Sequence, residues 1–298
     1  MGASYTQVNR LGTEVTKLNE TRIETNIRES LVKQLPLRTL CDYQPFYGTG
    51  TAANVAMAPT LSMTTLSENQ TTGNGDVTAT FTLTDRTLTA ALKAVDVVLT
   101  KQALEASVGN ITQLIINAGT RAGIVTLETD FCALYTEAPS TAPDHEIGVQ
   151  GGGWDWATIL AGQELLMTQS APGPYAVLAH TSDFSSLMTI PELTEAQIFG
   201  RGVIEQGANL DTGQVYVGNN NLMFYCSNNV TQSSGNRNMM FAKDGIGIRM
   251  KQDFTVSIDR SRLDVGERAI IIGMELWYAV GGTRNSSTTN KYIVEILT

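Results

Sequence analysis

The sequence predicts an α+β fold, and three patterns support this prediction. Apolar residues recur with the period of a helix over residues 101–138. Residues 77–84 alternate between apolar side chains and threonine, which is the period of a strand with one buried face. The last part of the chain, from residue 254 to residue 297, contains further apolar or alternating segments of strand length. A long helix combined with these strands is typical of the α+β class.

Composition limits the classes of function. The 298 residues allow one large domain or two, and a hydrophobic fraction of 42% is enough for a core. The net charge of −9 argues against a protein that reads a DNA or RNA sequence, because such proteins usually carry a basic face. Three widely spaced cysteines form neither a disulfide framework nor a CxxC metal motif, so a reducing compartment is the default. We find no secretion signal and no apolar run long enough for a membrane span.

The chain begins with a charged helical segment at residues 13–35. Its apolar side chains form one thin stripe, made of Val15, Leu18, Ile23, Ile27 and Leu31. Because this stripe is too sparse for a core of its own, we expect an arm that packs along its own chain or a neighbour. A frayed terminal helix is the alternative. Prolines and glycines interrupt residues 36–59, which we interpret as connective.

An extended two-stranded hairpin is expected next. Its strands are residues 60–66 and 77–84, and the turn-forming residues 67–76 separate them. An isolated hairpin is marginal in water, so this one needs a partner surface. The alternative is one edge of an ordinary sheet. Val95, Val97 and Leu99 continue the alternation as a further strand.

The helical segment 101–138 is the stretch around which the chain is organised. Its apolar positions advance in steps of four and three, which would place them in one stripe. They are Leu104, Val108, Ile111, Ile115, Ala118, Ala122 and Val125, and Thr129 and Cys132 extend the count. Asn110, Asn117, Arg121, Glu128 and Asp130 fall away from this stripe. Three glycines within it, Gly109, Gly119 and Gly123, indicate close packing, a bend or an interruption, so a pair of shorter helices is the alternative. Pro139 ends the segment.

The second half begins after the glycines at 151–153, which form the best internal boundary. Asp155 is a candidate cap for a helix at 156–169, in which Trp156, Ile159, Leu160, Leu166 and Met167 cluster on one side. Residues 175–179 read as a buried strand, and Thr181 or Ser182 then caps a short helix that ends at Met188. The order helix, strand, helix predicts a small α/β layer.

Strands dominate the remainder. We expect them at 214–217, 222–227, 254–258, 268–278 and 292–297. Residues 227–238 are polar and are interpreted as a surface loop. Three tryptophans are candidate anchors of contacts between subunits, since tryptophan is enriched at interface hot spots. They are Trp154, Trp156 and Trp277, and core packing is the preferred role for the last two.

The sequence offers little for catalysis. His145 lies in a loop expected to be solvated. His180 precedes Ser182 and Asp183, which suggests a hydrolytic triad, but adjacent residues on a turn rarely point at one another, and a helix cap explains the same letters. We find no phosphate-binding loop, dinucleotide fingerprint or zinc motif, and Gly48-Thr-Gly50 reads as a turn. Asp42, Asp155 and Glu164 are isolated carboxylates. We therefore assign no catalytic, cofactor-binding or metal-binding residue and no cofactor, and we do not expect an enzyme.

The order of these elements resembles the major capsid proteins of tailed double-stranded DNA bacteriophages with the HK97-type fold. Residues 93–106, a strand that feeds the long helix, are one part of the resemblance, and residues 159–167 followed by 172–179, a helix and then a strand, are the other. The resemblance covers essentially the whole chain. It implies an N-terminal arm at 1–45, an extended hairpin loop at 46–92, a peripheral domain with a spine helix at 93–150, an axial domain at 151–240, and C-terminal strands at 241–298 that return to the peripheral domain.

The resemblance also implies a function. A structural protein of this family self-assembles as hexamers and pentamers into an icosahedral shell that encloses the viral DNA genome without reading its sequence. The implied partners are other copies of the chain, a portal and a decoration protein, with no membrane. The implied scaffold is a separate scaffolding protein, and the alternative is that there is none. The implied location is the capsid of the virion, assembled in the host cytoplasm. The family's lysine to asparagine cross-links cannot be assigned to any residue here.

Two other functions remain open from the sequence. A bacterial nanocompartment shell of the encapsulin type has the same fold and encloses an enzyme cargo. A soluble α/β enzyme would need a pocket with converging titratable groups. The scarcity of histidine and of glycine-loop motifs, beside two long extensions, favours a shell over an enzyme.

Overall fold

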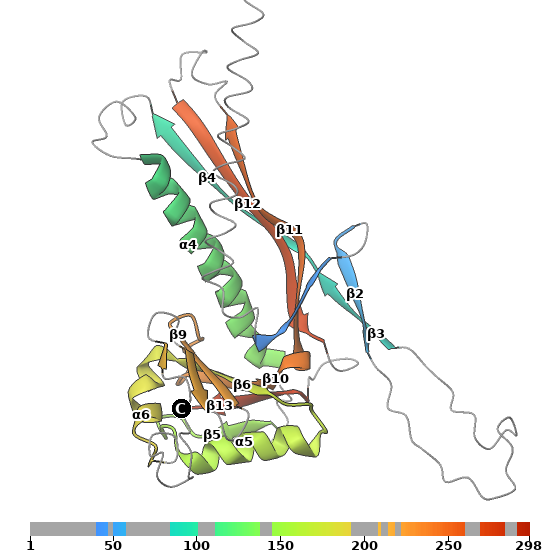
Figure 1. Cartoon of the computed structure of the whole chain (residues 1–298), viewed down its shortest axis with the longest axis vertical. Helices are drawn as coiled ribbons and strands as arrows, with labels where there is room; N and C mark the ends of the chain where they lie inside the picture. The colour runs from blue at the N-terminus through green and yellow to red at the C-terminus, as the bar shows by residue number, and fades with distance from the viewer. Residues whose placement is uncertain are drawn as a thin grey trace, which may run out of the picture.

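The computed structural model describes residues 40–46, 50–57, 84–100, 111–137, 145–191, 208–209, 214–217, 222–259, 269–283 and 291–298. The expected helix at 13–35 lies outside these residues, as do the first strand of the expected hairpin and all but the last residue of the second. The first ten residues of the long helical segment also lie outside them. The described residues form a long upper part and a compact lower part (Figure 1).

The upper part contains a sheet that we call the long sheet. In the described residues its strand order is β1-β11-β12-β4. The strands are β1 Asp42–Pro45, β4 Ala91–Thr100, β11 Ile246–Asp259 and β12 Ala269–Gly282. β12 is antiparallel to both β11 and β4, whereas β1 is parallel to β11. The strands expected at 254–258 and 268–278 are confirmed as parts of β11 and β12, but both elements are longer than the local alternation indicated.

Helix α4, Ile111–Cys132, runs along the long sheet and continues as the 3₁₀ helix η1, Ala133–Glu137 (Figure 1). It passes through Gly119 and Gly123 without a break, so the alternative of two shorter helices is wrong for residues 111–132. Its buried positions include Ile115, Gly119, Gly123, Leu127 and Phe131, which follow one another in steps of four.

The predicted stripe on α4 is therefore partly wrong. Ala118, Ala122, Val125 and Thr129 are exposed, although Ile115 and Cys132 are buried as expected. The physical reason is close packing at Gly119, where an added Cβ would lie 2.2 Å from Sδ of Met274 on β12. Two glycines form part of the inward face. A prediction from the spacing of apolar side chains therefore selects the wrong side of the helix.

A sheet that we call the compact sheet forms the lower part. In the described residues its order is β5-β13-β10-β6-β9-β8-β7. The strands are β5 Glu146–Gly148, β6 Tyr175–His180, β7 Ala208–Asn209, β8 Gln214–Val217, β9 Leu222–Ser227, β10 Arg237–Ala242 and β13 Ile293–Leu297. Its helices are α5 Trp156–Thr168, η2 Thr181–Asp183 and α6 Phe184–Met188, and η3 Lys243–Gly245 joins β10 to β11. The helix, strand and helix predicted for residues 156–188 are confirmed.

Alternate side chains of β6 and β10 enter two different cores. Met239 and Phe241 pack in the core that reaches α4 and the long sheet, whereas Met240 packs in the core beneath α5. The rings of Phe131 on α4 and Phe241 on β10 meet edge to face with centroids 5.5 Å apart. Helix α4 is therefore joined to the compact sheet through apolar contacts.

Four sequence expectations in the compact part are corrected. Residues 227–238 are not all a surface loop, since β10 begins at Arg237 and Asn238 is 0% exposed. The cap before the short helix is the His180 ring, which accepts from the backbone N–H of Ser182, rather than Thr181 or Ser182. Leu160 and Met167 on α5 are exposed and do not share the buried side of Ile159. The last strand, β13, pairs with β10 and β5 and so does not return to the long sheet with β11 and β12.

A separate strand pair leaves the long sheet. β2, Ala52–Met57, is antiparallel to β3, Thr84–Thr89, and we call this pair the hairpin root. It projects away from α4 and the long sheet (Figure 1). The interpretation of residues 36–59 as purely connective is wrong, because β1 and β2 both lie there. The division of the chain into five domains stays a prediction.

Candidate functional site

The three residues of the suggested triad contact one another, but their arrangement is not that of a catalytic triad. The His180 Nδ1 lies 2.7 Å from the Ser182 Oγ, so these neighbours do meet, contrary to expectation. The Asp183 Oδ1 accepts from the Ser182 Oγ at 3.5 Å, so the acid contacts the serine. In a working triad the acid orients the histidine instead. The histidine also caps the following turn, which is a structural role.

Asp183 is instead the centre of a buried polar cluster. Its Oδ2 accepts hydrogen bonds from Trp154 Nε1 at 3.1 Å, Asn238 Nδ2 at 2.8 Å and Thr298 Oγ1 at 2.7 Å. Its Oδ1 accepts from Asn236 Nδ2 at 2.7 Å. Several donors around one buried carboxylate stabilise it by hydrogen bonding. The cluster ties η2, Trp154, the β9–β10 loop, β10 and Thr298 together.

A second buried carboxylate joins α4 to the compact sheet. Glu128 is 7% exposed, and it accepts from the Tyr225 hydroxyl at 2.7 Å and from Asn229 Nδ2 at 2.6 Å. Burial and the nearby carboxylate raise the pKa of Tyr225 above its ordinary value, so the phenol remains a donor. Sequence analysis placed Glu128 on the polar side of the helix but did not identify its partners, because they lie about a hundred residues further along the chain.

Asp130, on the same helix, contacts the long sheet. Its Oδ2 accepts from the Tyr278 hydroxyl at 2.6 Å and lies 3.1 Å from Lys93 Nζ on β4. Burial and the hydrogen bond to Asp130 raise the pKa of Tyr278. α4 is thus held by one carboxylate to each of the two sheets.

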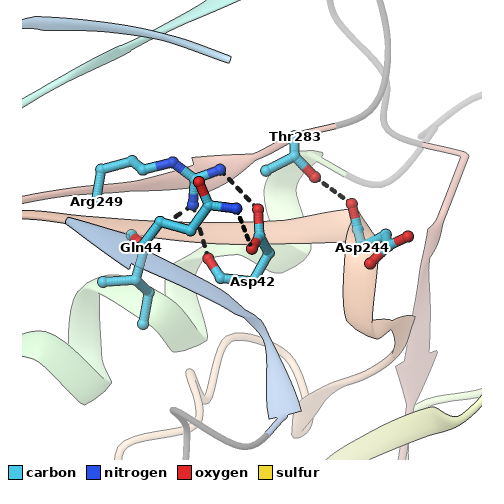
Figure 2. A network of polar contacts seen from close by, with 6 residues as sticks. Asp42, Gln44, Asp244, Arg249 and Thr283 are labelled. Atoms are coloured by element: carbon cyan, nitrogen blue, oxygen red, sulfur yellow. Dashed lines mark hydrogen bonds and ion pairs between the residues drawn. The ribbon is translucent and has the colours of Figure 1, made fainter. Parts of the chain in front are cut away.

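A partly buried ion pair holds strand β1 (Figure 2). The Arg249 guanidinium on β11 lies 2.6 Å from Asp42 Oδ2 and donates to the Asp42 carbonyl at 2.8 Å. The Gln44 amide donates to the other Asp42 oxygen at 2.9 Å. Nearby, the Thr283 hydroxyl donates to the Asp244 carbonyl. Asp42 is therefore not the isolated carboxylate of the sequence but the residue that fixes β1 beside β11.

The other titratable residues named from the sequence make contacts that stabilise the fold. His145, expected in solvent, is 3% exposed, and its Nε2 lies 3.1 Å from the Lys291 carbonyl. Asp155 caps α5 as predicted, accepting from the Thr158 N–H at 2.6 Å. Hydrogen bonds from the Thr158 side chain and from its backbone N–H lower the pKa of the Asp155 carboxyl. Glu164 is exposed, and its backbone carbonyl accepts from Thr168 Oγ1 at 2.8 Å.

The tryptophans divide between cores. Trp154 is 7% exposed in the core beneath α5, and Trp156 is half-buried against the same core. Trp277 packs at the hairpin root. Core packing is therefore confirmed for Trp156 and Trp277, and Trp154 is buried as well.

Two further findings concern metals and membranes. Among the described residues no three of His, Cys, Asp and Glu gather in a way that could hold a metal ion. Within that same part of the chain, no helix combines the length and hydropathy required to cross a bilayer.

Burial suppresses the reactivity of the thiols. Burial raises the pKa of the Cys226 thiol to about 11, and it also raises the pKa of Cys132. Both thiols therefore stay protonated near neutral pH, where a nucleophilic cysteine would need to be a thiolate.

The described surface carries exposed apolar side chains on β4 and α5. Leu92 and Val98 on β4 are 53% and 59% exposed, and Leu160 and Met167 on α5 are 42% and 61% exposed. β4 has one neighbour, β12, among the described strands of the long sheet. Exposed apolar side chains on a sheet edge and on a helix are typical of surfaces that contact other protein molecules.

Comparison with known proteins identifies the fold. No protein-family model matches the chain, and no curated protein sequence matches it. Solved structures match it over nearly its whole length. The capsid of cyanophage P-SCSP1u matches with a TM-score of 0.62 and 12% identity over 87% of this chain and 86% of that one. The chain has the HK97-like capsid fold.

Two further capsids support this assignment. The capsid of Ralstonia phage GP4 matches with a TM-score of 0.61 and 8% identity, covering 86% of each chain. The capsid of a native GTA particle matches with a TM-score of 0.59 and 12% identity, covering 89% of this chain and 90% of that one. The fold predicted from the order of elements is confirmed, although the identity to these capsids is only 8% to 12%.

Proposed function

We propose that this chain is a major capsid protein, which assembles with copies of itself into an icosahedral shell around a double-stranded DNA genome. The observation that carries the proposal is the match of 86% to 89% of the chain to solved capsid structures, with TM-scores of 0.59 to 0.62. The match covers 86% to 90% of each chain in these pairs.

The polar contacts described above suit a mechanical role. α4 is fixed to one sheet through Glu128 and to the other through Asp130. The hairpin root projects from this body, and apolar side chains are exposed on β4 and α5. A rigid body with projecting and apolar surfaces is what a subunit needs when it makes many contacts with identical neighbours.

We also propose the partners of this chain and its location. The subunits would form hexamers and pentamers, assisted by a separate scaffolding protein, with a portal at one vertex and a decoration protein outside. The net charge of −9 favours a container that does not grip its DNA, because each phosphate neutralised by a basic side chain adds affinity. The shell would be part of the virion and would assemble in the host cytoplasm.

Electron microscopy of the purified full-length chain tests the proposal, with light scattering as a second measure of mass. The experiment is repeated with the genes that neighbour its own coexpressed, so that a scaffold is supplied. We expect closed or partly closed polyhedral shells, or free rings of five and six subunits. A compact monomer or dimer under every condition would contradict the proposal. Shells that copurify with an enzyme and contain no DNA would favour the nanocompartment instead.

A further inference from the structure

The hairpin root is attached to the long sheet at a sharp change of pairing. β3 ends at Thr89 and β4 begins at Ala91, so the chain changes partner from β2 to β12 across Ala90 alone. The Ala90 N–H donates to the Thr51 carbonyl at 2.6 Å. The apolar cluster beneath this point is small. Its buried members are Ala53, Leu88, Ala90 and Ala279, with Phe46, Val55 and Trp277 packed against them.

Such a cluster contributes little to holding the hairpin root in one direction. Three of its four buried members are alanines, each of which buries a single methyl group. A strand pair without a substantial apolar face is marginal by itself. Some further interaction must therefore fix the angle at which the hairpin root leaves the sheet.

Lys251 on β11 supplies that interaction. The pairing register of β11 with β12 shifts between Met250 and Gln252, so Lys251 stands at an irregularity in the ladder. Its Nζ lies 3.6 Å from the centroid of the Trp277 ring and 5.4 Å from that of Phe46. The same ammonium donates to the Gly50 carbonyl, which lies two residues before β2.

These contacts join three pieces of chain. Phe46 follows β1, Gly50 leads into β2, and Trp277 belongs to β12. Gly50 has φ of +106°, a conformation that side chains other than glycine rarely adopt, so its carbonyl is aimed by the backbone itself. Among the described residues, Nε1 of Trp277 has no hydrogen-bond partner, so packing and the cation together hold the indole.

We propose that Lys251 acts as a clamp which sets the direction of the hairpin root, because its ammonium binds the Gly50 carbonyl while it lies over the Trp277 ring. It is a positioning residue, since it acts through the backbone at Gly50 and not on any ligand. Lys251 is half-buried and its ammonium contacts two rings, and a cation–π contact contributes more when it is partly desolvated. Loss of the charge frees the hairpin root while leaving both sheets folded.

Amide hydrogen exchange of the full-length, unassembled chain tests this clamp. The variant Lys251→Met keeps the length and the apolar stem of the side chain and removes the charge. Lys251→Arg keeps a cation over the indole and is the conservative rescue. Lys243→Met removes an exposed lysine on η3 and is the matched control for the change in net charge.

We expect faster exchange in β2, in β3 and at Ala90 when the charge is lost. A partly desolvated cation–π contact corresponds to a change of about 5- to 30-fold in the local opening equilibrium. Amides of β10 in the compact sheet should be unchanged in Lys251→Met, which reports that the fold is intact. Lys251→Arg should recover most of the protection, and Lys243→Met should match the original chain.

A double-mutant cycle with Trp277→Leu separates the clamp from simple packing. If the clamp is real, Lys251→Met has little further effect once the ring is gone. Equal effects of Lys251→Met in both backgrounds, or unchanged exchange at Ala90 in Lys251→Met, would overturn the inference. Because these measurements use the unassembled chain, they do not depend on shell formation. A failure of the clamp is thus distinct from a failure of the proposed function.

Discussion

Replacing Gly119 by alanine tests the closest contact between α4 and the long sheet. In an ordinary helix interior this change stabilises by about 1 kcal/mol, because alanine loses less backbone entropy than glycine. Here the added Cβ would lie 2.2 Å from Sδ and 2.9 Å from Cε of Met274, with the Phe254 ring at 3.7 Å. The sulfur is not the free end of the Met274 side chain, so the contact cannot be relieved by rotating one methyl group.

The magnitude follows from two opposing contributions. Overpacking of a well-filled core costs about 1 to 3 kcal/mol, and the gain in helix propensity offsets about 1 kcal/mol of it. We therefore expect Gly119→Ala to lower the free energy of unfolding by about 1 kcal/mol. For a chain of this size that corresponds to a fall in Tm of about 2 °C.

The assay is urea unfolding of the unassembled chain, followed by far-ultraviolet circular dichroism. Ala118→Gly, on the exposed side of the same helix, measures the propensity contribution alone and should cost about 1 kcal/mol. Met274→Ala removes the opposing atoms, and the double variant with Gly119→Ala should be more stable than the sum of the single effects predicts. If Gly119→Ala stabilises the chain by as much as Ala118→Gly destabilises it, the close contact with Met274 is refuted.

Three further predictions concern the buried polar groups. Glu128→Ala leaves the Tyr225 hydroxyl and the Asn229 amide without their acceptor, so urea unfolding should show a free energy of unfolding lower by about 2 to 4 kcal/mol. A decrease below about 0.5 kcal/mol would refute the role of Glu128 in joining α4 to the compact sheet. Asp183→Asn presents an amide to a cluster of donors, so we expect a loss of about 2 to 4 kcal/mol and an altered near-ultraviolet signal from Trp154, with an unchanged signal as the contrary result. The pKa of Cys226 is raised from 9.0 to about 11, so its thiolate fraction at pH 7 is about 100-fold below that of an ordinary thiol. Iodoacetamide should therefore modify Cys226 slowly in the folded chain at pH 7, faster as the pH rises toward 11, and at the ordinary rate in urea. Ordinary reactivity in the folded chain at pH 7 would contradict the raised pKa.

Features set by neighbouring residues were predictable from the sequence. The α5 helix and its cap at Asp155 follow from a hydrogen bond across three residues, and the buried strand that became β6 follows from an apolar run of strand length. The order of elements was also sufficient to identify the capsid fold, because each element has a local pattern even where no sequence relative matches.

Features that depend on distant partners were not predictable in the same way. β10 was missed because both of its faces are buried, so its sequence Arg-Asn-Met-Met-Phe-Ala has no alternation to detect. Which face of α4 points inward was missed because glycine, with no side chain to count, lies at the closest approach.

The sequence by itself determined the class of the fold, the position of most helices and strands, and the poverty of catalytic motifs, because these depend on residues a few positions apart. The tertiary structure decided which polar residues stabilise the fold through hydrogen bonds and ion pairs with distant residues. Asp183 meets Thr298 across 115 positions, Asp130 meets Tyr278 across 148, and Arg249 meets Asp42 across 207. A buried carboxylate and an exposed one have the same letter in the sequence, and only the packing of remote segments excludes water from one of them.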